Sequence, residues 1–558
     1  MKASGKFRFA KVSCRIPTNK KLSAFGTVMG LMILTFGTIS HAQTNLVTPA
    51  QYLQMQPKPN FAAGYNLPHL TRWGWTLSTN TDIQLATNWG YDLEFGGYAS
   101  PSQVTNIFTP GSYDSVVTYL ASNQPSLFKL SVIIDRTFPT PIPNGFYDTN
   151  SSGQILTNGE GGNAVSPEGP DSYWTNATAY WMQSLRVIQS NAPISIVLNG
   201  GEYGLDVPGF GEVAWKQDPR VQAQAVMTNA WATTNLTGTS WPRYTSDRKA
   251  HQLGFLTSAI EQQIPNRELY IFYDTGNEQN RYTALANWFD FYDNWGWWSS
   301  VMVTNTDLPS LEDYWSLGYN GWGSITNPLP NDILSRHLNA VGYNIELGHP
   351  LSYNWVNGGS GGAGGDTNNL SDIPSYTGFL KCLYTAGMVG GVAGYFTYPS
   401  GTNGTLIGGP GFDASFPSNS PPDWLQQMMA LSHVHALFSH LDNFLYNGTL
   451  LPGVTLNIMS TDQPAFEFTN TAGRVNDRVL ARKLLDQNHW IVTAWAADGV
   501  TNTVTVNIPT IGNLTVTAVP SASVYEVTMA GTNIQRILLD EYSSYPLPPP
   551  NNFRPVTP

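Results

Sequence analysis

The sequence predicts an α/β protein: a (β/α)8 TIM barrel followed by a small antiparallel β-sandwich. Two observations predict this fold. Between about residues 60 and 447, short β-type runs alternate with helix-type segments, which is typical of parallel strands joined by crossover helices. From about residue 450 the chain changes to short alternating strands separated by Gly, Asn and Asp, as in antiparallel β-domains.

The barrel is expected from eight β-type runs and the helical patterns between them. The runs cover residues 70–75, 91–95, 128–135, 194–198, 269–273, 301–304, 341–345 and 391–396. Segments such as 172–190 and 282–295 have helical periodicity, and Ser420 can cap a further helix over 424–445. Eight β/α units fit a TIM barrel with long loops, and a doubly wound sheet is the alternative.

The N-terminus has the order of a secretory signal. Seven basic residues and no acid precede an apolar run over residues 24–39, and Ser40-His41-Ala42 offers a cleavage site. An uncleaved anchor is the alternative, but the run is short and broken by glycines. We therefore expect a secreted or periplasmic protein with a signal peptide at 1–42, a barrel at 43–447, a β-sandwich at 448–545 and a proline-rich tail at 546–558.

Charge and cysteine content exclude several classes of partner. Without the seven basic residues of the signal, the chain has 20 Lys and Arg and 38 Asp and Glu. This acidic balance disfavours nucleic acid and anionic membranes. Cys382 would be the one cysteine left, so we expect neither an intramolecular disulfide nor a Cys/His zinc cluster, and we expect no cofactor or metal.

Composition favours a carbohydrate ligand. Aromatic residues make up 12% of the chain and charged residues only 12%, a combination rich in rings and uncharged polar groups. Exposed rings can stack on the C–H faces of sugars, while Asn, Thr and Ser can hydrogen-bond to hydroxyls. The alternative is a loop-rich protein that buries its rings in its core.

Two glutamates follow β-type runs, as catalytic groups of TIM barrels do. The fourth run continues as NGGEYG and brings Glu202 to the strand end, and the seventh continues as ELGHP and brings Glu346 there. Cleavage of a glycosidic bond needs one carboxylic acid to protonate the leaving oxygen and one carboxylate to attack the anomeric carbon or to activate water. Each glutamate could instead be a solvated loop acid.

Acids after strands four and seven resemble the arrangement of the retaining clan A glycoside hydrolases, which include β-galactosidases, β-xylosidases, cellulases and β-agarases. The resemblance implies Glu202 as the acid/base and Glu346 as the nucleophile of a glycosidase that cleaves a polysaccharide or oligosaccharide. It covers residues 60–447 and rests on architecture rather than on a long motif. One departure is that Gly201, not Asn, precedes Glu202, while Asn199 lies three residues before it.

Further polar and aromatic residues near the expected strand ends are candidates for substrate binding. They are Glu94, Asp135, Arg136, Asn199, Tyr273, Asp274, Asn305, Trp322, Tyr353, Trp355 and Tyr398. Asp135 and Arg136 could equally form a structural ion pair. If the strand count is shifted by one unit, Asn277-Glu278 fits the acid/base position of the clan instead of Glu202.

Other motifs do not support a different chemistry. Residues 359–364 match G-x-G-x-x-G but neither follow a strand directly nor open a clear helix, so a flexible loop is expected. His433, His435 and His440 are expected to be surface or core residues rather than metal ligands. The alternatives left open are a polysaccharide lyase and a catalytically inactive carbohydrate-binding barrel.

Overall fold

The structure is a computed structural model that describes most of the chain beyond the N-terminal segment. It describes residues 46–72, 83, 87, 90–95, 108–124, 130–133, 141–157, 162–199, 214–223, 240–266, 269–273, 308–310, 312–313, 338, 341, 351–357, 376–398, 415–417, 423–453, 464–469, 473, 475–485, 487–496 and 500–540. The expected signal peptide and tail lie outside them. Within this described part, no helix has the length and apolar character needed to span a membrane.

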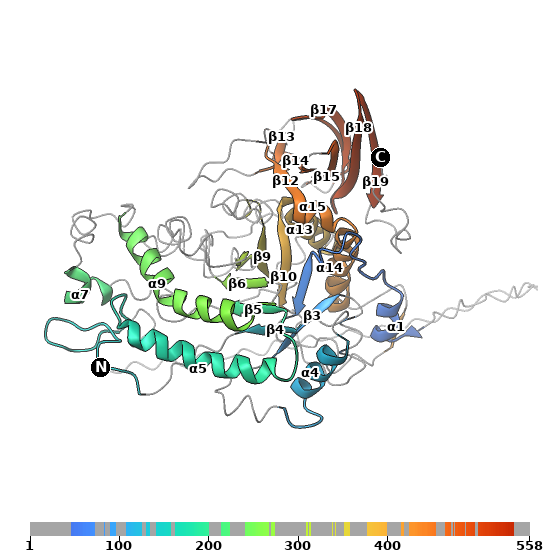
Figure 1. Cartoon of the computed structure of the whole chain (residues 1–558). Coiled ribbons are helices and arrows are strands. Elements are labelled where there is room, and N and C mark those ends of the chain that lie inside the picture. The colour runs from blue at the N-terminus through green and yellow to red at the C-terminus, as the bar shows by residue number, and fades with distance from the viewer. Residues whose placement is uncertain are drawn as a thin grey trace, which may run out of the picture. The chain divides into compact units, whose positions relative to one another are not determined.

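Parallel strands form the central sheet, part of which is seen in Figure 1. They are β2 (His69–Arg72), β3 (Tyr91–Phe95), β4 (Leu130–Ile133), β5 (Ile196–Asn199), β6 (Leu269–Tyr273), β7 (Leu308–Ser310), β8 (Glu312–Asp313), β9 (Ser352–Asn357) and β10 (Val392–Tyr398). Their order is β7-β6-β5-β4-β3-β2-β10-β9-β8, and every neighbouring pair is parallel. One residue separates β7 from β8 in the sequence, so the sheet curls round and brings its two ends together, and we count β7 and β8 as the sixth of eight barrel positions.

Helices connect the strands in the order that a TIM barrel requires. The bounds are α4 (Tyr113–Asn123), α5 (Asp171–Gln189), α9 (Ser240–Gln263), α13 (Tyr376–Gly390) and α14 (Asp423–Ser439). Shorter elements are β1 (Leu46–Val47), which pairs with β11 (Phe416–Pro417), and helices α1 (Pro49–Gln54), α7 (Pro219–Gln222) and α15 (Asp442–Asn447). Helices α5 and α9 run side by side (Figure 1).

Sequence periodicity explains how these helices pack. On α5, Trp174, Ala177, Trp181, Leu185 and Ile188 recur at three- and four-residue steps and are all buried. The remaining face of α5 is exposed, so the helix covers the barrel with one side only. Helix α13 differs, because every residue from 380 to 390 is buried, and it lies between α14 and the C-terminal sheet.

Six of the eight expected barrel strands coincide with the observed ones, and two were wrongly placed. The strand expected at 301–304 is found at 308–313, and residues 301–304 lie outside the described residues. The run 341–345 was expected to be strand seven, but Val341 is helical and the strand beside β10 is Ser352–Asn357. Leu338 and Val341 are both buried at helical spacing, so their apolar character reflects a packed helix.

The C-terminal segment forms two antiparallel sheets. The larger one has the order β12-β14-β15-β18-β19 with β13 also paired to β14, and the smaller one is the hairpin β16-β17. The bounds are β12 (Gly448–Leu451), β13 (Phe466–Thr469), β14 (Val475–Leu484), β15 (His489–Ala496), β16 (Asn502–Ile508), β17 (Gly512–Ala518), β18 (Ser523–Ala530) and β19 (Asn533–Asp540). The pattern in 502–518 alternates, because only one face of the hairpin is buried.

The central strands β14 and β15 of the larger sheet are buried on both faces. One face packs on the hairpin through Trp490, Val492 and Ala494, while the opposite face contributes Ile491 and Trp495 to the core that contains α13, α14 and α15. Every residue of β15 is consequently buried. The described barrel residues and the sheet therefore share one continuous hydrophobic core.

Candidate functional site

The carboxyl ends of the barrel strands form one rim, because all eight strands are parallel. The last residues of the strands are Arg72, Phe95, Ile133, Asn199, Tyr273, Asp313, Asn357 and Tyr398. Four of the expected substrate-binding residues have their backbone at or next to this rim: Asn199, Tyr273, Trp355 and Tyr398. Asn357 pairs with Tyr398 in register, and Glu94 lies one residue before the end of β3.

Other expected site residues lie outside the described residues, but the strand bounds fix their distance along the chain from the rim. Glu202 comes three residues after Asn199, Asp274 comes directly after β6, and Asp135 and Arg136 come two and three residues after β4. Trp322 and Glu278 also lie outside the described residues. Asn305 does too, and it precedes the observed sixth strand, so its expected position after that strand was wrong.

Strand seven lies later in the sequence than expected, which changes the position of Glu346 relative to it. Glu346, which lies outside the described residues, was expected to follow the strand at 341–345. The observed strand β9 begins at Ser352, so Glu346 precedes it by six residues, on the side of its amino end in chain order. Glu346 therefore does not follow the observed seventh strand in the sequence, and its catalytic role stays a prediction.

Two carboxylates on the sixth strand were missed by the sequence analysis. Glu312 and Asp313 form β8, and their backbones pair with Trp355 and Val356 of β9. The segment LPSLED has a proline and two acids, which are depleted in strands, so β-propensity did not reveal it. An acid lies near the end of most of the eight strands, and this recurrence is the signal that could have revealed Glu312 and Asp313.

Tyr353 does not have the role expected for it. It was expected to be a sugar platform, but its side chain is fully buried inside the barrel. Its hydroxyl lies 2.5 Å from Thr71 Oγ1, and its ring stacks near His69, which in turn forms a 2.8 Å contact with Asp92. Burial also raises the pKa of Tyr353 well above its usual range. These groups fill the barrel interior and are structural.

The connections that leave β4 and β5 pack together into an ordered layer. Trp215 is fully buried and donates its Nε1–H to Val165 O at 2.8 Å. Asp218 accepts from the backbone N–H of Thr149 at 3.0 Å, and Arg220 donates to the carbonyls of Gly145 and Tyr147. Residues 200–213, which include Glu202, connect β5 to this layer, so both chain ends beside Glu202 are held by packed structure.

A buried pair of carboxyl groups anchors that layer. Asp148 and Asp218 are fully buried, and Arg220 binds Asp218 through Nη2 at 2.6 Å. Burial opposes ionisation of Asp218, but the guanidinium of Arg220 holds its pKa below the usual range. Burial and the neighbouring Asp218 raise the pKa of Asp148 to about 9, so Asp148 keeps its proton at neutral pH. Neither group is open to a substrate, and the pair is structural.

The three histidines of the C-terminal barrel helix are core residues. His433 and His435 are buried, and their Nε2 atoms bond to Gln56 Oε1 at 3.0 Å and to Pro68 O at 2.7 Å. His440 is also buried. Burial lowers the pKa of His433 to about 3, so it stays neutral at physiological pH. Of the two locations expected for these histidines, surface or core, the core is the observed one.

No family model and no curated protein matches this sequence. Among solved structures, a mutant of isomaltulose synthase from Erwinia rhapontici in complex with D-glucose is similar over 85% of this chain and 100% of its own, at 8% identity and a TM-score of 0.48. An α-amylase from Geobacillus thermoleovorans, complexed with acarbose, is similar over 83% and 98%, at 10% identity and a TM-score of 0.40.

A GH36 α-galactosidase from Geobacillus stearothermophilus, complexed with raffinose, is similar over 88% of this chain at 11% identity and a TM-score of 0.41. The chain spans only 57% of the length of that protein. Because these TM-scores and identities are low, the assignment of the barrel rests on its own strand order and register.

Proposed function

We propose that this chain is an exported glycoside hydrolase that cleaves a polysaccharide or oligosaccharide at the carboxyl rim of its barrel. The observation that carries the proposal is the curled sheet of parallel strands with eight barrel positions, since TIM barrels place their catalytic groups at this rim. The low charge and high aromatic content of the chain favour a neutral sugar as substrate.

We propose Glu202 as the general acid/base. It follows the last residue of β5 by three positions in the sequence, and acids at this position of a barrel strand are suited to catalysis. A proton donor must lie within hydrogen-bond reach of the leaving oxygen. The expected chemistry is protonation of the glycosidic oxygen as the bond breaks.

We propose Glu312 as the first partner to test, with Glu346 as the alternative from the clan A resemblance. Glu312 belongs to a barrel strand and pairs in register with Trp355. Its carboxylate would attack the anomeric carbon and form a glycosyl-enzyme that water then hydrolyses. This retaining course requires the two carboxyl groups to lie about 5–5.5 Å apart, and a wider separation would give inversion.

Single substitutions separate these assignments. We expect Glu202→Gln to lose activity on natural glycosides by about 10²-fold or more but to retain activity on aryl glycosides with good leaving groups, which need little protonation. A nucleophile variant, either Glu312→Ala or Glu346→Ala, should lose activity on both substrates, and azide should restore some turnover with inverted product. The measurement is reducing-end release alongside aryl glycoside cleavage, with unfolding midpoints as the control for folding.

Each possible result decides between the proposals. If Glu346→Ala alone is inactive on both substrates, the nucleophile is Glu346 and not Glu312. If Glu202→Gln cleaves natural polysaccharide at the wild-type rate, Glu202 is not the acid and Glu278 is tested next. Ultraviolet-absorbing unsaturated products would identify a lyase, and binding without any turnover would identify an inactive barrel.

A further inference from the structure

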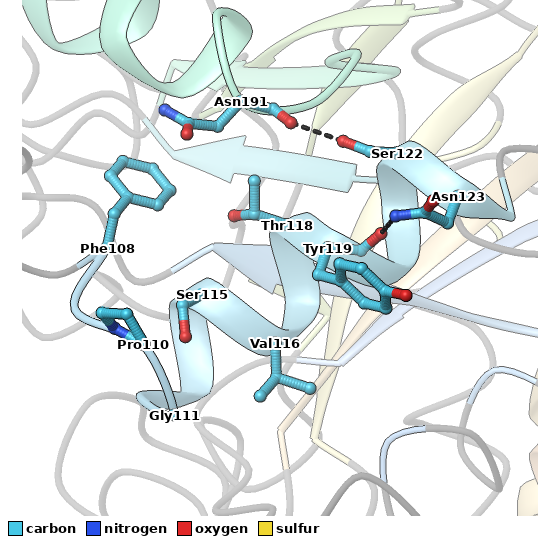
Figure 2. Close-up of a pocket in the computed structure, with 10 residues that line it drawn as sticks. All are labelled: Phe108, Pro110, Gly111, Ser115, Val116, Thr118, Tyr119, Ser122, Asn123 and Asn191. Carbon is cyan, nitrogen blue, oxygen red and sulfur yellow. Dashed lines mark hydrogen bonds between the residues drawn. The ribbon is translucent and has the colours of Figure 1, made fainter.

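A hollow lies on the outside of the barrel along helix α4. Its volume is about 480 Å³, and it is bounded by the segment Phe108–Gly111, by α4 and by Asn191 (Figure 2). Asn123 and Asn191 precede β4 and β5, so this part of the hollow is near the amino ends of those strands, opposite the carboxyl rim. The hollow therefore extends along α4, from Phe108, which stacks on Phe95 at the end of β3, to residues that precede β4 and β5.

Its lining combines aromatic rings with uncharged polar groups. The lining residues are Phe108, Pro110, Gly111, Ser115, Val116, Thr118, Tyr119, Ser122, Asn123 and Asn191. None of them carries a formal charge at neutral pH. Tyr119 is 64% exposed, the most exposed large hydrophobic side chain of the described residues, and Phe108 is held by stacking on Phe95 at 5.4 Å between ring centroids.

Five polar side chains of this lining donate hydrogen bonds within the protein. Five donations go to backbone carbonyls: Ser115 Oγ to Ser112, Thr118 Oγ1 to Asp114, Ser122 Oγ to Asn191, Asn123 Nδ2 to Tyr119 and Asn191 Nδ2 to Val187. Asn191 Nδ2 also donates to Ser190 Oγ. No described residue donates to the side-chain oxygen of Asn123 or Asn191. The hollow thus offers hydroxyl lone pairs and amide oxygens as acceptors, together with the second N–H of Asn123 and the hydroxyl of Tyr119 as donors.

An uncharged lining with hydroxyls and amides selects a particular ligand chemistry. A phosphate, sulfate or carboxylate is bound most strongly by a cationic side chain, and the lining residues include none. A neutral saccharide brings many O–H donors for the acceptors and apolar C–H faces for the rings of Tyr119 and Phe108. The volume is in the range that holds a small molecule.

We propose that this hollow along α4 is a binding site for a neutral saccharide in addition to the proposed catalytic site, and that it holds the chain on its polymer. The proposal does not depend on the barrel being a hydrolase, because a sugar-binding barrel without activity could use the hollow in the same way.

Affinity electrophoresis of the full chain tests the site. The gels contain soluble starch, galactomannan, xylan or agarose, with sulfated carrageenan as an anionic comparison. We expect at least one neutral polymer to retard the wild-type protein and carrageenan to have no such effect. Tyr119→Ala should bind the polymer about five-fold more weakly, as calculated from the retardation, since loss of one aromatic contact is worth about 1 kcal/mol. Asn123→Ala should weaken it as well.

A matched control is available in Tyr446, which is 59% exposed and stacks on Tyr65 at 4.3 Å, away from α4. Tyr446→Ala should migrate as the wild type does. The proposal is overturned if no neutral polymer retards the wild type, if Tyr119→Ala and Tyr446→Ala behave alike, or if carrageenan retards the protein through Tyr119. Cleavage of a small aryl glycoside should be equal in all of these variants.

A direct measurement at the hollow excludes effects from the rim. Cys382 is buried, and it is the one cysteine outside the expected signal peptide, so Ser122→Cys can be labelled selectively with an environment-sensitive dye. An oligosaccharide of the retarding polymer should change the emission of this dye, also in a Glu202→Gln background. Unchanged emission at saturating oligosaccharide would overturn the site. If the wild type hydrolyses no substrate but the dye emission still changes, the proposed function is contradicted and the binding site is not.

Discussion

The burial of Asp148 should make the free energy of unfolding depend on pH. The folded carboxyl keeps its proton up to about pH 9, whereas the unfolded one loses it near pH 3.8. Between these values the folded state binds more protons than the unfolded state, so the free energy of unfolding should fall as pH rises. Above about pH 9 both states have lost the proton and this contribution no longer changes.

We predict that Asp148→Asn removes this dependence. An uncharged amide has no proton to lose, so the variant should be more stable than the wild type at pH 8, and the difference between them should shrink toward pH 4. Urea unfolding of both proteins at pH 5, 6.5 and 8 measures it. A variant that is less stable than the wild type at pH 8 would show that Asp148 is ionised in the folded protein.

Asp218→Asn is the contrasting variant for the same pair. The pKa of Asp218 is lowered by Arg220, so its charge stabilises the folded state above the unfolded pKa. Its loss leaves the guanidinium without its partner and weakens the bond from Thr149 N. This variant should be destabilised at neutral pH, and therefore the two carboxyl groups should respond in opposite directions.

Strand β10 needs a residue without a side chain at position 394, which is Gly394. A Cβ at Gly394 would fall well inside van der Waals distance of the Tyr353 ring, which lies opposite it in register on β9. We predict that Gly394→Ala lowers the free energy of unfolding by about 1–3 kcal/mol, the usual cost of overpacking a core. Thermal unfolding measures the effect.

The second substitution Tyr353→Leu identifies the cause. By itself it should destabilise the protein, because a ring and the bond to Thr71 are lost. Combined with Gly394→Ala it should cost less than the sum of the two single effects, because the clash partner is gone. Strict additivity would mean that Gly394 is needed for its backbone conformation rather than for the space beside Tyr353.

Barrel strands were predictable from sequence where they are buried apolar runs. Residues 91–95 and 269–273 have the predicted bounds, since such runs are bordered by polar loops. Strand six was missed because Pro309, Glu312 and Asp313 give it no apolar run. A strand was expected to include Val341 because a short apolar run looks the same in a buried helix, but Val341 is helical and packs near Gly390.

The candidate site was less predictable than the fold because it depends on strand ends. An error of a few residues in the position of a strand decides whether a neighbouring acid comes after that strand or before it. Glu346 was expected to follow strand seven, but it precedes the observed strand in the sequence. Burial is also invisible in a single sequence, so Tyr353 read as a platform although it is a core residue. The hollow beside α4 brings together residues 108–123 and Asn191, and no local pattern connects them.

Across the molecule, the helices α13, α14 and α15 and the C-terminal sheet share one hydrophobic core. Arg482 of β14 is almost fully buried and donates to the carbonyls of Phe444 at 2.6 Å and Leu445 at 3.0 Å, in the last turns of α15. Burial lowers its pKa to about 10, so it still carries its charge at neutral pH. The same elements share the hydrophobic core through Leu484 and Trp495.

We predict that Arg482→Met lowers the free energy of unfolding by about 1–3 kcal/mol, because two buried carbonyl groups lose their donor. Since sheet and helices share a core, the loss should shift one calorimetric transition rather than split it in two. Arg536→Met is the matched control, because Arg536 is exposed and only lies over the ring of Tyr525 at 5.3 Å. It should cost less than about 1 kcal/mol. Two separate transitions in Arg482→Met would mean that the sheet folds independently of α13, α14 and α15.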